Sequence, residues 1–383
     1  MLIVELLFWF LLALVIYVYA GYPAFLWILT YLTGGRPVDT GPVEPAVTLI
    51  ISAYNEAEVI ARKIRNSLAI DYPRHLLELL VVSDASDDGT DDIVGQFESD
   101  GVVLVRMEQR GGKTTGLNEA VKRARGEIVV FSDANAMYRT ESLRAMLKNF
   151  HDPAVGCVVG ESTYESSSAG ADKSESAYWR YETALKRLES KLGSVVGGDG
   201  AIYAIRKELY RPMNADALSD FVNPCQIVEM GKRCVYEPAA VSVEAAAGTY
   251  DKEFRRKVRI VNRAWRATIA NRRLLNPFRF GLFSLGLFSH KFLRWIVPFL
   301  LAVVFCANLI LAPAHVLYKV TLGLQLAFYG LALTGRLLRR SGELPVVLYV
   351  PYYFCLVNFA SACGIWESYR GKTYTTWSTA RTD

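Results

Sequence analysis

Apolar residues gather at the two ends of the chain and leave a patterned middle between them. Residues 2–20 read LIVELLFWFLLALVIYVYA, and the apolar character continues to about residue 33. Three further apolar runs lie at about 293–313, 316–335 and 345–366. A helix needs roughly 20 residues to cross a bilayer core. The pattern predicts an N-terminal transmembrane segment within residues 1–33, three transmembrane segments within 291–367 and a tail at 368–383.

The residues that flank these runs indicate how the chain meets the membrane. No basic residue precedes the first run, which favours a retained segment over a cleaved signal peptide. Between Lys252 and Arg294 the chain has twelve Lys or Arg against one acid, Glu253. Because positive residues flank spans on the cytoplasmic side, residues 251–290 are predicted to form basic interfacial helices that contact membrane lipids. Nucleic-acid binding is the alternative use of such charge, but the membrane-flanking position already accounts for it.

Short apolar strands alternate with amphipathic helices through the middle of the chain. Strands are predicted from their apolar runs at 47–53, 79–83, 102–105 and 128–131. Helices are predicted from apolar residues spaced along one face at 56–70, 91–97, 117–124 and 141–150. Such alternation is typical of an α/β fold with a mostly parallel sheet flanked by helices. We therefore expect an α/β domain over residues 45–250, after a linker rich in Gly and Pro at 34–46.

Polar side chains follow three of the predicted strands. The first strand is followed by residues 54–56, the second by Asp84, and the fourth by Asp133 and Asn135. Ligands bind beyond the carboxyl ends of strands in such sheets, so these side chains are expected to share a site. Asp84 could accept hydrogen bonds from a base or ribose. Asp133 and Asn135 offer oxygen ligands to a hard cation such as Mg²⁺, although a turn stabilised by Asp and Asn is the alternative.

Two glycine-rich segments and one acid extend the candidate site. Gly111 and Gly112 precede Lys113 and a helix, an arrangement that can bind an anion through the helix N-terminus and the lysine charge. Residues 197–200, GGDG, precede an apolar strand, and a hairpin turn is the alternative interpretation. Asp220 stands among apolar and aromatic residues and could take a proton from an attacking hydroxyl. A helix N-cap is the alternative role for this acid.

Together these segments resemble glycosyltransferase family 2, which includes the cellulose, chitin and hyaluronan synthases. The matching segments run in the family's order: SAYNE at 52–56, SDASDDGT at 83–90, GGKTTGLN at 111–118, FSDANAMY at 131–138, GGDGAIYAIR at 197–206, LSDF at 218–221 and EFRRKVRI at 253–260. The resemblance implies a GT-A fold and transfer of a sugar with inversion at the anomeric carbon.

The resemblance also implies roles for particular residues. Asp220 resembles the family's catalytic base. The donor-binding residues implied are Tyr54, Glu56, Asp84, Lys113, Asp133, Arg256 and Arg259, with Asp133 and Asn135 at a Mg²⁺ or Mn²⁺ ion. The acceptor-side candidates are Glu161, Gly198, Asp199, Trp265 and Trp377. Glu161 and Glu244 are similar to recurrent acids of the family whose roles the resemblance does not assign.

Three motifs depart from the family pattern. The usual DxD is here Asp133–Ala134–Asn135, so the second metal ligand is neutral. The paired acid is Ser219–Asp220, which leaves one carboxylate to act as base. The QxxRW motif reads Arg256–Lys257–Val258–Arg259–Ile260 and therefore lacks its Trp. The neutral ligand bears on metal affinity, and the missing Trp is evidence against a cellulose-like polymerase.

The sequence therefore predicts a multi-pass enzyme of the plasma (inner) membrane with a cytoplasmic catalytic domain. It would transfer a sugar from a UDP-linked donor to a lipid-linked or growing glycan, in contact with polysaccharide-assembly partners. A non-catalytic nucleotide-binding subunit of a glycan-assembly complex is the main alternative, and a transporter is another. One span before the domain and three after it would place the tail outside. A re-entrant C-terminal span, or a tail without a catalytic part, would resolve the disagreement with relatives whose tail lies near the active site.

Overall fold

The computed structural model describes residues 1–165, 172–245, 250–339 and 344–376. Its central domain is built on an eight-stranded sheet in the order β3-β2-β1-β4-β7-β6-β8-β5. The strands are β1 (Val47–Ala53), β2 (Leu77–Ser83), β3 (Val102–Arg106), β4 (Ile128–Asp133), β5 (Met137–Tyr138), β6 (Val155–Glu165), β7 (Tyr203–Arg206) and β8 (Arg233–Ala245). The first four pair in parallel, whereas β7 is antiparallel to both of its neighbours. The predicted α/β fold with a mostly parallel sheet is confirmed.

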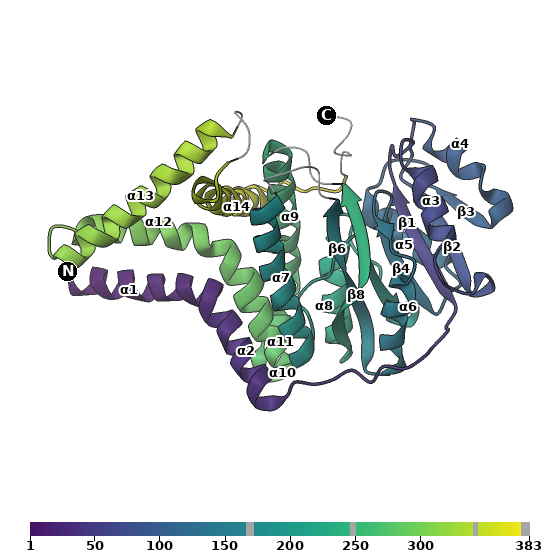
Figure 1. The fold of residues 1–383 in the computed structure, drawn as a ribbon, viewed down its shortest axis with the longest axis horizontal. Coiled ribbons are helices and arrows are strands. Elements are labelled where there is room, and N and C mark those ends of the chain that lie inside the picture. The colour runs from purple at the N-terminus through teal and green to yellow at the C-terminus, as the bar shows by residue number, and fades with distance from the viewer. Residues whose placement is uncertain (166–171, 246–249, 340–343, 377–383) are drawn as a thin grey trace.

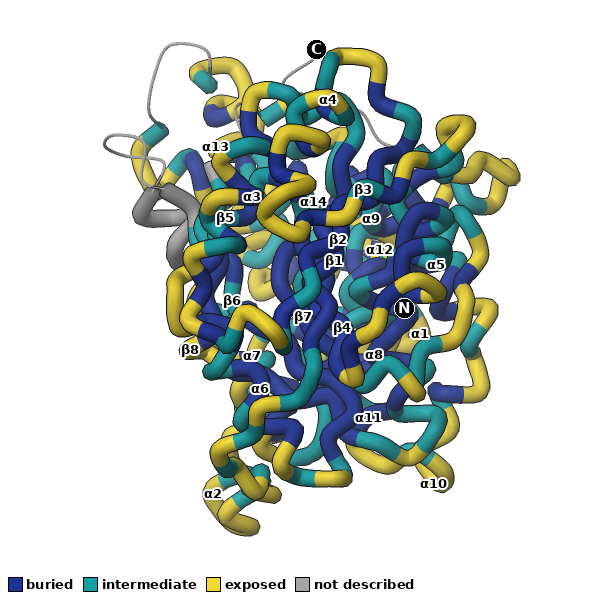
Figure 2. The backbone as a smooth tube through the Cα atoms, turned by 90° about the vertical axis from the view of Figure 1, so that its right-hand side faces the viewer, coloured by how far each residue is buried: buried dark blue, intermediate teal, exposed yellow. Residues whose placement is uncertain are grey.

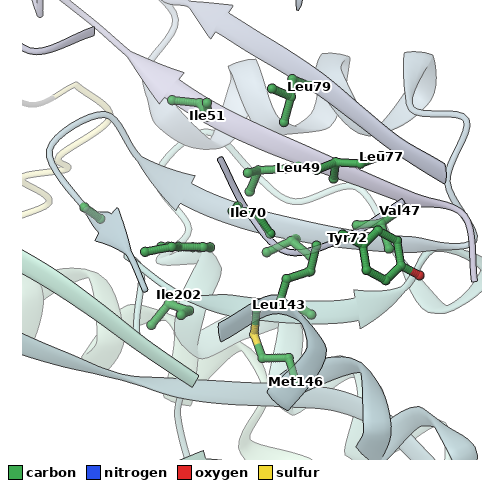
Figure 3. Packing of buried hydrophobic residues seen from close by; sticks show 14 of the residues in the cluster. Val47, Leu49, Ile51, Ile70, Tyr72, Leu77, Leu79, Leu143, Met146 and Ile202 are labelled. Carbon is green, nitrogen blue, oxygen red and sulfur yellow. The ribbon is translucent and has the colours of Figure 1, made fainter. Parts of the chain in front are cut away.

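Helices cover both faces of this sheet and bury its strands. The domain helices are α3 (Ile60–Leu68), α4 (Thr90–Gly95), α5 (Lys113–Arg123), α6 (Ser142–Leu147), α7 (Asp172–Leu192), α8 (Ser219–Glu229) and α9 (Tyr250–Ala270). Leu49 of β1 packs on one face with α3, α4 and α6, and Ile50 packs on the other with α5 and α8. Figure 3 shows Leu49 with Leu143 and Met146 of α6 in the first cluster. Strands β1, β2 and β4 therefore read as nearly continuous apolar runs, and they lie in the interior in Figure 2.

The apolar ends of the chain form long helices that extend away from the sheet. The long helices are α1 (Leu2–Ile16), α2 (Tyr22–Thr33), α12 (Arg294–Leu311), α13 (Val316–Leu338) and α14 (Val346–Tyr369). Two short helices, α10 (Pro277–Phe280) and α11 (Leu282–Gly286), precede α12. Short π-helical segments join α1 to α2 and α11 to α12. Among the described residues, the four stretches long and apolar enough to cross a membrane are Leu2–Thr33, Leu282–Leu311, Val316–Leu338 and Val346–Tyr369. Figure 1 shows α1 and α12 side by side, with the N-terminus far from the sheet.

A buried ionic cluster ties the domain to these helices. His290, in the π-helical turn before α12, lies 2.8 Å from a carboxylate oxygen of Glu189 and 3.2 Å from one of Glu182. Arg294 also pairs with Glu182, and the hydroxyl of Tyr22 donates to Glu189 at 3.0 Å. Both glutamates belong to α7, so this helix is fixed to the N-terminal and C-terminal apolar helices at once.

The last apolar helix, α14, lies lengthwise against α9 of the domain. The rings of Tyr250 and Tyr352 are 5.3 Å apart near its start. Near its end, a side-chain carbon at Gly364 would sit 2.7 Å from the carbonyl oxygen of Val258. Beyond it, the amide of Asn262 donates to the carbonyl of Lys372 at 3.2 Å. Since α14 starts and ends beside α9, the described part of the tail lies next to the domain.

Candidate active site

The candidate site forms where three parallel strands end at one edge of the sheet. In β1, Ala53 lies opposite Ser83 of β2, and Ser52 lies opposite Asp133 of β4. The residues that follow these strands therefore come together because the strands are in register. This edge gathers the three strand-end segments that the sequence pattern placed in one site.

Asp84 holds the glycine loop that precedes α5. Its side chain is buried, and its carboxylate accepts backbone N–H bonds from Gly111 at 2.7 Å and from Gly112 at 2.9 Å. Gly112 has φ +88°, a conformation that side-chain-bearing residues rarely adopt. The two N–H bonds fix the loop so that α5 begins at Lys113, facing the strand ends. Contact between Asp84 and a nucleotide base stays a prediction.

Lys113 connects the strand-end acids to the second glycine loop. Its ammonium donates to the Asp133 carboxylate and, at 3.2 Å, to the carbonyl of Gly200. A side-chain carbon at Gly200 would lie 3.5 Å from that ammonium and 3.6 Å from a carboxylate oxygen of Asp220. The structure therefore brings Lys113, Asp133 and Asp220 together, although they lie in three separate parts of the sequence.

Asp220 occupies the first turn of α8 against the GGDG loop. Its backbone carbonyl accepts a 2.6 Å hydrogen bond from the N–H of Gly198. Burial raises the pKa of its carboxyl above the ordinary value, and the nearby charge of Lys113 opposes that shift. Asp199 of the same loop raises it further. A carboxylate with a raised proton affinity is suited to act as a general base.

The residues at the predicted metal site offer oxygen atoms as metal ligands, but few of these oxygens belong to carboxylates. The amide of Asn135 donates to Glu244 at 3.4 Å. Burial, together with the charges of Asp199 and Asp133, raises the pKa of Glu244 to about 7. In the described part of the chain, no group of three or more His, Cys, Asp or Glu could hold a metal ion. Mg²⁺ and Mn²⁺ sites often use one or two carboxylates plus substrate phosphates, so Asp133 and Asn135 fit an ion shared with a diphosphate.

The loops that follow β1 and β2 form another wall of the candidate site. The N–H of Glu56 donates to the Thr90 hydroxyl at 2.9 Å, which ties the two loops together. The guanidinium of Arg110 lies 3.7 Å from the ring centroid of Tyr54. Arg110 was not among the predicted site residues, although it stands directly before the glycine pair. An aromatic ring beside a guanidinium at this edge provides a surface on which a planar base could stack.

Helix α9 carries arginines along the side of the site. Burial and the charge of Arg256 lower the pKa of Arg259, while Asp133 opposes that shift, so Arg259 lies within electrostatic reach of the strand-end acid. One turn later, Arg263 donates to the Thr114 hydroxyl at 3.2 Å and to the carbonyl of Asp216 at 3.0 Å. Sequence reasoning missed Arg263, although its spacing of four residues from Arg259 places both on one helix face.

Some predicted acceptor-side residues have other partners. The carboxylate of Glu161 accepts from Thr183 at 3.1 Å and from Tyr236 at 2.6 Å, which fixes α7 to the sheet. Trp265 is buried and stacks on Phe292 with ring centroids 5.2 Å apart, so its ring belongs to the core under α12.

The remaining acceptor-side candidates lie in the GGDG loop and in the tail. Gly198 and Asp199 are at the site, where Asp199 accepts from Ser162 at 2.9 Å. Trp377 lies outside the described residues. The described part of the tail nevertheless reaches the site, because a side-chain carbon at Gly112 would sit 1.9 Å from the carbonyl oxygen of Thr375. The tail therefore packs directly on the glycine loop that Asp84 holds.

Comparison with known proteins agrees with this geometry. Residues 48–211 match the family model described as Glycosyl transferase family 2. The poly-beta-1,6-N-acetyl-D-glucosamine synthase of Staphylococcus aureus (strain COL) is 26% identical over 202 residues, which are 51% of this chain and 48% of that protein. The synthase of Staphylococcus epidermidis is 26% identical over 164 residues, 42% of this chain and 39% of that protein. The chain thus spans about half the length of the curated relatives it matches.

A solved structure resembles almost the whole chain. The mannosyltransferase PcManGT from Pyrobaculum calidifontis, in complex with GDP-Man and Mn²⁺, covers 94% of this chain and 99% of its own, with a TM-score of 0.73 and 26% identity. The mixed sheet, with carboxylates at the ends of its parallel strands, is that of a glycosyltransferase with a GT-A fold. Within this class, the chain carries a glycosyltransferase family 2 domain. The family and the fold expected from the sequence are confirmed.

Proposed function

We propose that this chain transfers a sugar from a nucleoside diphosphate sugar to a lipid-linked or growing glycan, with inversion at the anomeric carbon. The observation that carries the proposal is the convergence of Asp220 and the Lys113–Asp133 pair on Gly200. The Asp220 carboxylate stands beside Lys113 and Asp133, which are suited to hold a diphosphate. Direct displacement needs a single base, and Ser219 occupies the position of the first acid of the family's pair.

In the proposed reaction, an acceptor hydroxyl attacks the anomeric carbon from the face opposite the nucleotide. The bond from that carbon to the diphosphate oxygen breaks, and the nucleoside diphosphate leaves with its electron pair. Asp220 takes the hydroxyl proton, and its raised pKa suits that task. Lys113 and Arg259 supply positive charge near the leaving diphosphate. A bound Mg²⁺ or Mn²⁺ would neutralise further charge there, held by Asp133 and Asn135.

The relatives support two donors for the first experiments. The mannosyltransferase that resembles nearly the full chain was solved with GDP-Man and Mn²⁺. The staphylococcal synthases, which match about half of the chain, are named for a polymer of N-acetylglucosamine. The likeness over the whole chain makes GDP-mannose the first donor to test and UDP-N-acetylglucosamine the second. The latter is the UDP-linked class expected from the sequence.

The packing of α14 supports a membrane topology. We infer that α1, α12 and α13 cross the membrane and that α14 lies at its cytoplasmic surface along α9. The guanidinium of Arg339, just after α13, pairs with Asp251 of α9 at 3.0 Å, so α13 returns to the side of the domain. A membrane-impermeant thiol reagent should label a cysteine placed after Asp383 only when cytoplasmic access is opened. Labelling from outside intact cells would contradict this topology.

A donor panel tests the proposed function. A ligand that binds only the folded state raises its stability by RT ln(1 + [L]/Kd). The purified full chain is heated with GDP-mannose, UDP-N-acetylglucosamine and other nucleotide sugars, with and without Mn²⁺, and donor hydrolysis is measured in parallel. One donor is expected to raise the melting temperature and to be turned over in a Mn²⁺-dependent manner. Stabilisation without turnover or transfer of any donor would favour the non-catalytic subunit.

A further inference from the structure

Helix α3, which follows the SAYNE loop, buries a lysine under the candidate metal turn. Lys63 has 0% of its surface exposed, and its ammonium donates to the backbone carbonyl of Ala136. The same ammonium lies 4.0 Å from the ring centroid of Tyr138. Lysine is almost never fully buried unless its charge is paired, so this position needs an explanation beyond packing.

A second residue of α3 holds the same segment. The amide of Asn66 donates to the carbonyl of Tyr138 at 2.8 Å, and its oxygen accepts from the N–H of Tyr138 at 2.8 Å. Lys63 and Asn66 are three residues apart and so lie on one face of the helix. The N–H of Ala136 closes the turn on the carbonyl of Asp133 at 3.2 Å. Helix α3 therefore holds this turn on the side away from the candidate site. The same turn presents Asp133 and Asn135 to the site.

The charge of Lys63 fits the chemistry in front of that turn. Burial lowers the pKa of Lys63 to about 7, and the carboxylates of Asp133 and Glu244 oppose that shift. An apolar side chain of similar volume often replaces a buried charge with no loss of stability. Protonated Lys63 would favour negative charge at the turn, and negative charge at the turn in return favours the protonated lysine.

We propose that Lys63 is a positioning residue that orients the Asp133–Ala136 turn and makes it favourable for the diphosphate of the donor. It acts through the turn and does not touch the substrate. The proposal rests on the proposed function, because it needs a diphosphate at Asp133. Asn66 supports the same turn through hydrogen bonds without charge.

A double-mutant cycle on nucleotide binding tests this role. The probes are GDP and UDP, each with Mn²⁺, titrated calorimetrically into the full-length protein and its variants Lys63→Met, Asp133→Ala and the double variant. Coupled neighbours show interaction energies that correspond to about threefold to a hundredfold in affinity. Lys63→Met is expected to weaken binding by about tenfold in the wild-type background and by less than about twofold in Asp133→Ala. A purely structural lysine would weaken binding equally in both backgrounds.

The chain offers a matched control in Lys207. Its ammonium also donates to a backbone carbonyl, that of Ala124, but at the edge of the sheet opposite the site. Lys207→Met is expected to lower the melting temperature and to leave nucleotide affinity within about twofold of wild type. Lys63→Arg, which keeps the charge, should bind more tightly than Lys63→Met, and Lys63→Gln is the neutral variant if Met does not fold.

The outcomes separate the two proposals. If the wild-type protein binds GDP or UDP and both neutral Lys63 variants bind it equally well, the role of Lys63 is overturned and the proposed function stands. Equal effects of Lys63→Met in the two backgrounds would overturn it as well. A wild-type protein that binds neither GDP nor UDP would overturn the proposed function and, with it, the role of Lys63.

Discussion

The two halves of the sheet place their functional groups in different ways. In the parallel half, β1, β2 and β4 deliver Tyr54, Asp84 and Asp133 directly from strand ends that lie in register. In the mixed half, Asp199 comes from a loop and Asp220 from the first turn of α8, and both depend on contacts with distant segments. The difference teaches that the residues proposed to bind the donor follow from local pattern, whereas those proposed to act on the acceptor depend on tertiary packing.

The largest effect is expected from the acid of the mixed half. General-base catalysis contributes about a hundredfold to ten-thousandfold in rate, and Asp220→Asn should reduce sugar transfer by that amount. The substitution keeps the side-chain shape, so donor affinity should stay within about twofold of wild type. Steady-state transfer and calorimetric donor binding are measured on the same preparation. Transfer at the wild-type rate would remove Asp220 from the role of base.

The parallel half should respond differently to a comparable substitution. Asp133→Ala removes the carboxylate that Lys113 pairs with, and it should weaken donor binding and transfer together. Loss of one preorganised electrostatic contact reduces turnover by about a hundredfold to a thousandfold. Glu119→Ala on the exposed side of α5 is the matched control. An Asp133→Ala variant with unchanged donor affinity would contradict the assignment of donor binding to the parallel half.

The pH dependence of transfer sharpens the same comparison. A base acts in its ionised form, and burial raises the pKa of Asp220 above the ordinary carboxyl value. The ionised fraction is therefore lost as pH falls, starting above the usual carboxyl range of about 4. The rate should drop about tenfold per pH unit below that raised value. A profile of kcat/KM that stays flat down to about pH 4 would contradict this assignment.

The smallest effect on catalysis is expected at Glu161. Because this carboxylate accepts from Thr183 and Tyr236, Glu161→Gln should lower stability by about 1–3 kcal/mol while transfer changes little. Thermal unfolding and transfer are compared at a temperature where both proteins are folded. A loss of transfer as large as that of Asp220→Asn would instead support the predicted acceptor-side role of Glu161.

The parallel half of the fold could be predicted from sequence because its signals are local. Strands β1 and β2 are short apolar runs, and the acids follow them within a few residues. Lys63 carried a weaker signal, since it interrupts the apolar face formed by Ile60 and Ile64 of α3. A charge on a buried helix face indicates an unusual position, but its partner Ala136 cannot be read from spacing.

The mixed half and the tail depend on contacts that sequence spacing does not contain. Trp265 was predicted as an acceptor-side residue because it follows the arginines of α9. Its ring is instead buried in the core, where it stacks on Phe292. Counting apolar runs would place the tail outside, and the sequence left a re-entrant span or a tail without a catalytic part as alternatives. Counting does not contain the contact between α14 and α9, which approach closely at Gly364. Composition reports that a helix is apolar, and packing decides where it lies.

The stereochemistry of transfer tests the central claim most directly, because a single base at Asp220, with Ser219 in place of a neighbouring acid, permits direct displacement without a covalent intermediate. Full-length protein is incubated with Mn²⁺, the donor identified in the panel and a short lipid-linked acceptor, and the anomeric configuration of the first product is measured by proton NMR. The account predicts a product inverted relative to the donor, formed at least about a hundredfold more slowly by Asp220→Asn. A product that retains the donor configuration would contradict it.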